Sequence, residues 1–310
     1  MKTFEEVYTT RHDRKMVNWS KDSAIVSDSL MTNHVIPALG KKPIDKIDGD
    51  MIDKLLIAMD KKGFVASRKK AYPKIVNVFK LAKRKKYIKF NPALDIDTSD
   101  YKTKSSTPRA TSVKEKDISK ILNLLNNNYH YLQTWQVTIA SDLMPYMMSR
   151  PIEICGLMWD EVNFDDKVII IPKERMKSDR DHQIPMSNQV FKLLKEAETH
   201  RMNSEYVFPS PRGQGPITTR SLLLRLRRAG IKTDELTTHG FRSMASTILN
   251  EGVHIKAFNK DAIEMQLAHK DTTQRGVYNH AAYFDSRVEM MQSWADYIDS
   301  ISNKMGTSLN

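Results

Sequence analysis

The chain has 310 residues, which is enough for one large domain or two ordinary ones. A hydrophobic content of 40% and a mean hydropathy of −0.52 fit a globular protein and argue against wholesale disorder. The sequence has no run of 18 apolar residues and no signal-peptide core, and its lone Cys155 cannot form an internal disulfide. We therefore expect a cytoplasmic protein without membrane contact.

Positive charge is concentrated in one segment. The net charge is +12, and residues 61–89 contain twelve Lys and Arg and no Asp or Glu, so this segment equals the whole net charge. Clustered cations suit the neutralisation of a polyanion such as DNA, although a solvated helix face would look the same. The candidate contact residues in this segment are Arg68, Lys69, Lys70, Lys74, Lys80, Lys83 and Arg84.

The first hundred residues show apolar side chains at helical spacing. The expected helices cover residues 3–19, 20–36, 48–63 and 67–88, with a turn over 37–44. Ser20 is a plausible N-cap, Gly63 a stop signal, and Pro73 makes the last helix begin late or kink. Residues 99–112 are rich in Ser and Thr without an apolar pattern, which predicts an interdomain linker.

The second part mixes helices with a little strand. Ser112 and Glu115 have capping-box spacing ahead of an apolar run, and 167–187 holds a β-branched run, a charged turn and an apolar return, which predicts a hairpin. Helical periodicity covers 151–157, 188–198, 218–230, 238–252, 261–270 and 286–301. The fold class is therefore mainly α with a small β element.

Several reactive side chains lie at the edges of these elements. Arg150 precedes Pro151 at a predicted helix start, where exposed amides favour an anion. Lys177 lies in the hairpin turn, His239 and Arg242 are three apart near a helix N-terminus, and His269 ends another helix. Taken singly, each also fits a surface arginine, a solvated lysine, or a capping or half-buried histidine.

Together these groups form a set that suits phosphodiester transesterification. Two guanidiniums can grip non-bridging oxygens and offset the charge of a pentacoordinate transition state. An imidazole can move a proton at neutral pH, and a lysine can protonate a leaving oxygen. A tyrosine becomes a useful nucleophile when a cationic site lowers its pKa.

The order and spacing of these motifs resemble the tyrosine recombinase (phage integrase) family, most of all the integrases of prophages and genomic islands. The likeness is carried by SRPIE around Arg150, ERMKSDRDHQIP around Lys177, HGFR at 239–242, LAH ending at His269, and Tyr278 nine residues later. The tail RGVYNHAAYFDSRVEMMQSWADYID is typical of that branch, and the resemblance covers nearly the whole chain.

The resemblance implies a role for each residue. Arg150, His239 and Arg242 would bind and activate the scissile phosphate, His269 would add a hydrogen bond, and Lys177 would protonate the departing 5′ oxygen. Glu153 would orient the arginine, and Tyr278 would form a 3′-phosphotyrosyl link that conserves the bond energy. No ATP, metal or other cofactor is then required, which agrees with the absence of a Walker-type loop or metal-ligand spacing in the sequence.

The resemblance also implies an architecture and partners. Residues 1–98 would form a helical, SAM-like core-binding domain, and 113–310 a mixed α+β catalytic domain, the two closing on DNA as a C-shaped clamp. The protein would be a monomer in solution and a homo-tetramer on the double-stranded DNA of attachment sites, associated with the bacterial nucleoid and aided by DNA-bending or directionality proteins. Island-type relatives commonly carry a further N-terminal domain for arm-type sites.

Two departures and several alternatives accompany this interpretation. The family usually has Gly where this chain has Ala268, and a small, glycine-rich context where it has Met148 and Ser149. The C-terminal helix through Trp294 and Tyr297 would pack on a neighbouring protomer or, alternatively, in the core of its own domain. The alternative functions are a catalytically inactive DNA-binding protein of the same fold and a type IB topoisomerase-like relaxing enzyme.

Two tyrosines compete for the role of nucleophile. On one helix, Tyr278 and Tyr283 would point about 140° apart, so they cannot share a pocket. The resemblance assigns the nucleophile to Tyr278 and a packing role to Tyr283.

Overall fold

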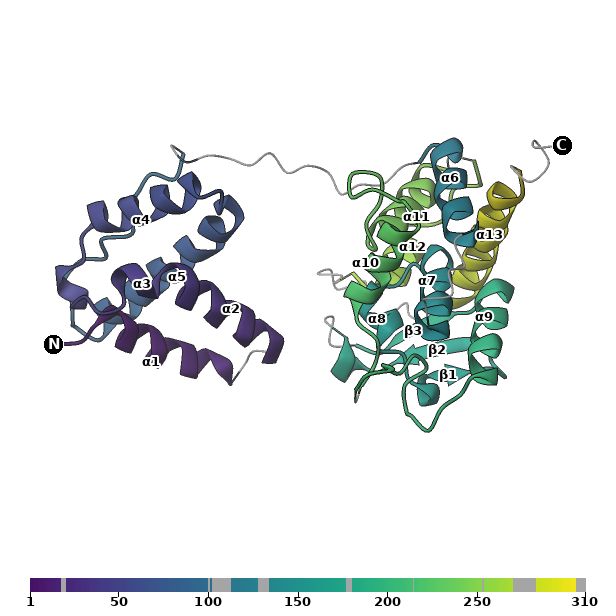
Figure 1. The fold of residues 1–310 in the computed structure, drawn as a ribbon, viewed down its shortest axis with the longest axis horizontal. Coiled ribbons are helices and arrows are strands. Elements are labelled where there is room, and N and C mark those ends of the chain that lie inside the picture. Colours follow the sequence, from purple (N-terminus) through teal and green to yellow (C-terminus); the bar gives the residue numbers. More distant parts are fainter. Residues whose placement is uncertain are drawn as a thin grey trace. The chain divides into compact units, whose positions relative to one another are not determined.

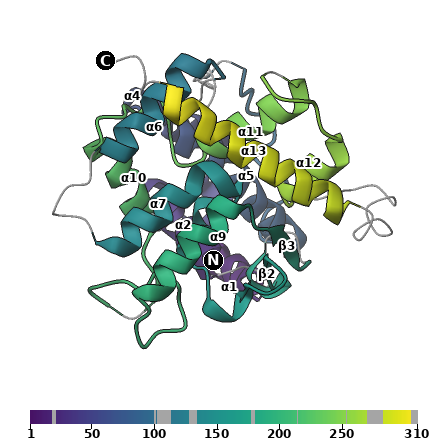
Figure 2. The same cartoon turned by 90° about the vertical axis from the view of Figure 1, so that its right-hand side faces the viewer.

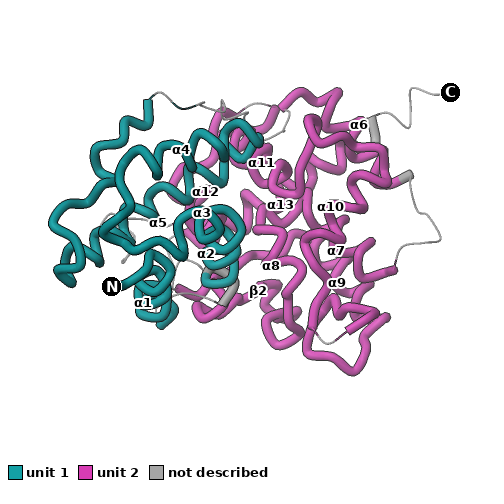
Figure 3. The backbone as a smooth tube through the Cα atoms, turned by 60° about the vertical axis from the view of Figure 1, so that its left-hand side comes forward, with its two compact units in different colours: residues 1–106 teal, residues 107–310 magenta. Residues whose placement is uncertain are grey.

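The computed structural model describes residues 1–17, 21–99, 101, 113–127, 134–176, 180–213, 215–252, 254–269 and 283–304. The chain divides into two compact units, Met1–Ser106 and Thr107–Asn310 (Figure 1; Figure 3). Both are mainly helical, and a small sheet belongs to the second, which confirms the predicted fold class. None of the described helices combines the length and apolar character needed to cross a membrane.

Unit 1 is built from helices around one apolar core. Its elements are α1 (Phe4–Met16), α2 (Lys21–His34), α3 (Ile36–Leu39), a 3-10 turn (Ile44–Lys46), α4 (Gly49–Lys61) and α5 (Val65–Arg84). Thr3 and Glu6 form a capping box at the start of α1, and the Asp48 side chain caps α4 by accepting the Met51 N–H at 2.8 Å. Phe4 and Phe79 pack in the core with ring centroids 5.6 Å apart.

Two prolines lie inside helices. Pro73 lies inside α5, which begins at Val65, so this helix does not begin late, the first of the two expected effects of this proline. Pro37 lies in the first turn of α3, where a missing N–H costs nothing, so part of the predicted turn over 37–44 is helical. Gly63, at φ +80, follows the end of α4 as predicted, whereas Ser20 lies outside the described residues.

Arg68 is a buried structural residue, which corrects its prediction as a DNA contact. The residue is 3% exposed, and its Nε lies 2.7 Å from Oδ1 of the buried Asp60. Its guanidinium also lies over the ring of Tyr101, 4.6 Å from the centroid. Tyr101 is itself buried in unit 1 and donates to Asp53, so the packed part of this unit extends beyond residue 98 into the predicted linker.

Unit 2 carries the remaining elements. Its helices are α6 (Glu115–Asn127), α7 (Trp135–Met147), α8 (Pro151–Cys155), α9 (Asn188–Thr199), α10 (Thr219–Arg228), α11 (Gly240–Glu251), α12 (Lys260–Gln266) and α13 (Phe284–Lys304). The sequence did not predict α7, because nearly every side of this helix is buried and no amphipathic period remains. It packs against α8, α9, α10, α11 and α13 and forms the centre of the unit.

The predicted hairpin is present, and a third short strand extends it. Strands β2 (Val168–Ile171) and β3 (His182–Pro185) pair antiparallel, with Ile169 opposite Ile184, and β1 (Val162–Asn163) pairs with the free edge of β2. The described residues between these two strands are 172–176, 180 and 181. Two residues are too few for β1 to show a period in the sequence.

The C-terminal helix α13 packs inside its own unit. It contacts α6, α7, α12 and β3, and it crosses this part of the structure in Figure 2. Trp294 is fully buried and its indole N–H donates to the Pro145 carbonyl at 2.7 Å, while Tyr297 is 6% exposed. These two side chains therefore belong to the intramolecular core and not to the expected contact with a neighbouring protomer.

The single cysteine is part of the same core. Cys155, the last residue of α8, is 1% exposed, and burial raises the pKa of its thiol to about 12. The thiolate form that reacts with oxidants and electrophiles is therefore scarce at neutral pH.

Candidate active site

Arg150 is held at the junction between α7 and α8. The chain leaves α7 through Met148, which has a left-handed backbone (φ +55) and a buried side chain. Arg150 then serves as the N-cap of α8, ahead of Pro151. The Glu153 carboxylate accepts the Arg150 backbone N–H at 2.8 Å and its Nη1 at 2.6 Å, so one acidic side chain fixes both the backbone and the guanidinium.

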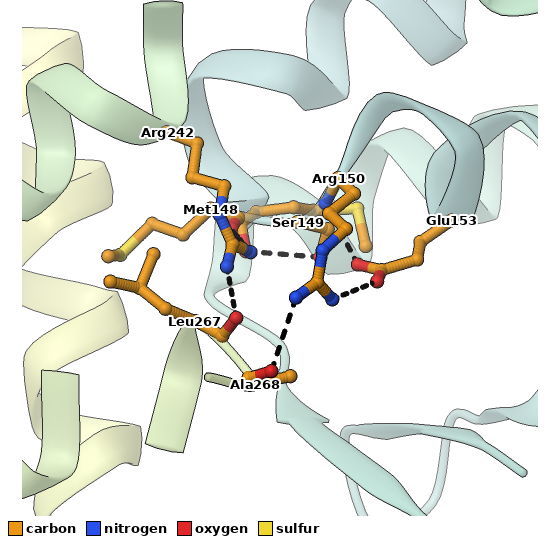
Figure 4. Close-up of polar contacts among 8 residues, drawn as sticks. Met148, Ser149, Arg150, Glu153, Arg242, Leu267 and Ala268 are labelled. Carbon is orange, nitrogen blue, oxygen red and sulfur yellow. Dashed lines mark hydrogen bonds and ion pairs between the residues drawn. The ribbon is translucent and has the colours of Figure 1, made fainter. Parts of the chain in front are cut away.

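Arg242 connects this junction to the end of α12. It lies in the first turn of α11, is 8% exposed, and donates through Nη1 to the Met148 carbonyl at 2.9 Å. Its Nη2 donates to the Leu267 carbonyl, and the neighbouring Ala268 carbonyl accepts Nη2 of Arg150 at 3.2 Å (Figure 4). Two consecutive carbonyls thus receive the two guanidiniums, which brings together three segments that are far apart in the sequence.

The two predicted histidines lie beside these arginines along the chain, in more exposed positions. His239 is the N-cap of α11 and is exposed, whereas Arg242, three residues later, is buried. His269 follows the Ala268 carbonyl, and its Nδ1 lies 2.6 Å from Oε2 of Glu264. This pairing occupies one ring nitrogen of His269 and leaves Nε2 as the nitrogen that can face a substrate.

Lys177 and Tyr278, the other two predicted site residues, lie outside the described residues. The described neighbours nearest to them in sequence are Met176 and Arg180 for the lysine, and His269 and Tyr283 for the tyrosine. Tyr283 donates to Asp261 of α12 at 3.3 Å, which gives it a packing contact. Within the described ranges, no three His, Cys, Asp or Glu side chains come together as metal ligands would.

Ala268 adopts a backbone conformation that favours glycine. Its φ is +45, in the left-handed region, and this is the position where the family usually has Gly. We expect Ala268→Gly to raise the free energy of unfolding by about 0.5–1 kcal/mol, because it removes this strain and only one methyl group. Chemical denaturation measures the change.

Met148 provides the matched control for that substitution. It has a similar φ of +55, but its side chain is 1% exposed. Met148→Gly should therefore lower the free energy of unfolding by about 2–5 kcal/mol, since the lost burial outweighs the relieved strain. A destabilised Ala268→Gly protein would show that the local backbone carries no strain.

Two further polar side chains of the site were not predicted from the sequence. His182 on β3 is 5% exposed, and Arg287 in the first turn of α13 is 4% exposed. Burial, together with the positive charges of Arg287, Arg242 and Arg150, lowers the pKa of His182 to about 3. The imidazole is therefore neutral and lies within electrostatic reach of all three guanidiniums. A buried polar residue on a strand gives no signal in a single sequence.

The neutral His182 makes folding sensitive to acid. Its ordinary pKa is 6.5 and its folded pKa is about 3, so between these values the unfolded chain binds a proton that the folded chain does not. The free energy of unfolding should fall as the pH drops through this window, by up to about 1.4 kcal/mol per pH unit from this residue. Urea denaturation at pH 7, 6, 5 and 4 should show a flatter profile for His182→Gln than for the wild type.

The matched control for this pH profile is His200→Gln, which replaces an exposed histidine of the same unit. It should keep the wild-type slope. Equal slopes for the wild type and His182→Gln would contradict a neutral, buried imidazole.

Unit 1 contains a basic groove between α1 and α5. The groove has a volume of about 410 Å³ and is lined by Arg11, Arg14, Lys15, Asn77, Lys80, Leu81 and Arg84.

Of the candidate contacts predicted on α5, Lys69, Lys70, Lys80, Lys83 and Arg84 are exposed. Lys74 is half-buried, donates to Ser27 at 2.6 Å, and has its pKa lowered by burial and by Arg11. The α1 cations were not predicted, because they lie outside the basic segment 61–89, in a helix that also contains acidic residues.

The fold and the arginine site define a class of protein that comparison with known families identifies. The phage integrase family profile matches residues 111–284, and the profile of the phage integrase central domain matches residues 4–99. The chain belongs to the phage integrase family and is a site-specific tyrosine recombinase of mobile-element integration.

Individual relatives support the same assignment. The integrase of Shigella phage Sf6 is 31% identical over 301 residues, which cover 96% of this chain and 75% of the relative. The prophage integrase IntZ of Escherichia coli K12 is 32% identical over 309 residues, covering 99% and 73%. The fold is also that of the Tn1549 transposon integrase (residues 82–397) in complex with circular intermediate DNA, with a TM-score of 0.67, 19% identity, and coverage of 94% and 99%. A λ integrase (75–356) dimer bound to a COC′ core site gives a TM-score of 0.68 at 16% identity, covering 88% and 97%.

Proposed function

We propose that the chain cleaves and rejoins duplex DNA through a covalent bond between Tyr278 and a 3′ phosphate. The Tyr278 hydroxyl gives up its proton to a histidine of the site as its oxygen attacks phosphorus. The bond from phosphorus to the 5′ oxygen breaks, and Lys177 delivers the proton that this 5′ oxygen takes up. In the reverse step a 5′ hydroxyl of a partner strand attacks the phosphotyrosine and releases the tyrosine. The bond energy is kept throughout, so the exchange needs no external energy source.

The observation that carries this proposal is the pairing of Arg150 and Arg242 on two consecutive carbonyls. A guanidinium has five N–H donors in a fixed plane, and the described contacts of Arg150 use its Nη1 and Nη2 for Glu153 and Ala268. These contacts hold both cations at one place, where they can bind a phosphate and offset the charge of the transition state. His239 and His269 would add hydrogen bonds to the same phosphate, with Glu153 orienting Arg150.

The substrate we assign is the double-stranded DNA of attachment sites, bound by both units. The λ integrase tetramer bound to a Holliday junction shares this fold, with a TM-score of 0.66 at 16% identity, and supports a tetramer on DNA as the working assembly. A monomer in free solution, accessory DNA-bending or directionality proteins, and association with the nucleoid complete the proposal.

A nicked suicide duplex tests this function directly. The duplex carries the repeat sequence that flanks the gene, with a nick placed so that the cleaved fragment diffuses away and rejoining is blocked. The expected result is a protein–DNA adduct that survives denaturing electrophoresis, forms without ATP, and persists in EDTA. Failure to form an adduct on any flanking repeat would overturn the proposal and favour a DNA-binding protein without catalysis.

The α1–α5 groove should contribute phosphate contacts to DNA binding. Its cations Arg14 and Lys15 are exposed and adjacent, so the double variant Arg14→Gln/Lys15→Gln should weaken DNA binding at low salt. Each lost phosphate contact should reduce the slope of log affinity against log salt by about 0.9. Titrations at several salt concentrations measure this slope.

The control for the groove carries the same change of charge elsewhere on unit 1. Lys41 and Lys42 are also adjacent and exposed, and they do not line the groove. Lys41→Gln/Lys42→Gln should leave the salt slope unchanged. If the two double variants behave alike, the groove has no special part in binding.

A further inference from the structure

Arg287 is a buried cation whose described partners are neutral. Its Nε and Nη2 donate to Oε1 of Gln266 at 3.1 and 2.7 Å, and Nη2 also donates to the Gln183 carbonyl. Among the described residues, no carboxylate lies within ion-pair distance of this guanidinium. Burying a cation in this way is costly, so its retention calls for a reason beyond packing.

The acceptor of these bonds lies directly beside the arginine site. Gln266 is fully buried and is the last residue of α12, so the next two carbonyls along the chain, of Leu267 and Ala268, are those that receive Arg242 and Arg150. Its Nε2 also faces the Met147 carbonyl at 3.4 Å. The side chain of Gln266 thus connects Arg287 to both backbone turns against which the two site arginines are placed.

A comparison with another buried arginine separates this arrangement from ordinary packing. Arg225 is 2% exposed in the same unit, but its Nη2 lies 2.9 Å from a carboxylate oxygen of Asp142. Arg287 has no such described partner, and its bonds go instead to the side chain of Gln266 and the carbonyl of Gln183. Its location and its bonding therefore both point to the adjoining site.

We propose that Arg287 is a positioning residue of the strand-transfer site: by holding Gln266, it fixes the 266–268 turn against which the guanidiniums of Arg150 and Arg242 are aligned on the scissile phosphate. The proposal rests on the proposed function. Arg287 itself touches no reacting atom; it acts through the turn. A small displacement of that turn moves both guanidiniums, and misplacement by about 1 Å can cost on the order of 100-fold in rate.

The test compares Arg287→Gln and Arg287→Lys with the wild type on two suicide duplexes. One duplex has a normal phosphate at the scissile position, and the other has a methylphosphonate, which carries one negative charge less and depends less on aligned guanidiniums. On the normal duplex, we expect Arg287→Gln to form the adduct about 10- to 100-fold more slowly, with DNA affinity retained. The fall should be smaller on the methylphosphonate, and Arg287→Lys, which keeps the charge and one hydrogen bond, should lie between.

Three further variants make the result decisive. Gln266→Leu breaks the same contact from the other side and should reproduce the rate pattern of Arg287→Gln, which guards against a variant that does not fold. Arg225→Lys, a buried arginine away from the turn, should lower thermal stability without changing the ratio between the two duplexes. Val288→Ala, at an exposed position of the same helix, should behave as the wild type.

The outcomes separate this proposal from the function on which it rests. A wild-type rate in folded Arg287→Gln overturns the positioning role, as does a loss that is equal on both duplexes and tracks the unfolded fraction. A wild-type protein that forms no adduct overturns the proposed function instead, and the positioning role falls with it.

Discussion

Tyr278→Phe is expected to abolish the protein–DNA adduct completely while leaving folding and DNA affinity unchanged. The substitution removes one oxygen, and that oxygen forms the covalent bond in the proposed reaction, so no residual route to the adduct remains. Denaturing electrophoresis after incubation with the suicide duplex gives the adduct yield, and a filter-binding or mobility-shift titration gives the affinity.

Tyr283→Phe is the matched control, because it makes the same chemical change five residues away. Tyr283 has a described partner, Asp261 on α12, in a hydrogen bond of 3.3 Å between exposed side chains. Its loss should cost less than about 1 kcal/mol of stability and should leave adduct formation intact. The reverse pattern, with the adduct lost in Tyr283→Phe and kept in Tyr278→Phe, would exchange the two roles.

Asp60→Ala is expected to lower the free energy of unfolding of unit 1 by about 3–5 kcal/mol. The substitution removes the carboxylate that pairs with the buried Arg68, and breaking a buried ion pair by removing one partner costs more than the pair itself contributes. The side chains of Arg68 and Asp60 are only 4% and 8% exposed, so solvent can do little to replace the lost contact. Urea denaturation followed by circular dichroism measures the change.

The double variant Arg68→Met/Asp60→Leu is the comparison for Asp60→Ala, because it removes both charges of the pair. Replacing both partners by apolar side chains of similar volume should cost much less than Asp60→Ala, since no buried charge remains. The double variant should also bind DNA as the wild type does, because Arg68 is not a surface cation. A loss of DNA affinity in this variant would restore Arg68 to the binding surface, and a cost below about 1 kcal/mol for Asp60→Ala would show that solvent reaches the pair.

Most helices of the fold were predictable because their apolar faces repeat at the helical period and their ends carry capping residues. Helix α7 was not predicted, because it is buried on nearly every side and has no polar face to reveal its period. At Arg68 the basic run led to a wrong prediction. A run of basic residues indicates a solvated surface, and only the tertiary structure shows that Arg68 points inward to Asp60.

In the candidate site, too, some features could be predicted from the sequence and others only from the structure. The motifs around Arg150 and Arg242 could be found from their order along the chain, but the two carbonyls that hold them belong to backbone and leave no mark in the sequence. The sequence shows that position 268 has Ala where the family usually has Gly, but it does not show the positive φ of this residue. His182 and Arg287 matter through burial and proximity, and neither property can be derived from one chain without its fold.

The inert core thiol of Cys155 makes this protein ready for site-directed fluorescent labelling. Maleimide dyes react with thiolates at accessible positions, and the one native cysteine offers neither, so no cysteine has to be removed first. A single cysteine introduced at an exposed position of each unit, such as Lys62 and Lys192, would carry a donor and an acceptor dye. Energy transfer between the dyes would then report, in real time, how the spacing of the two units responds when DNA is added.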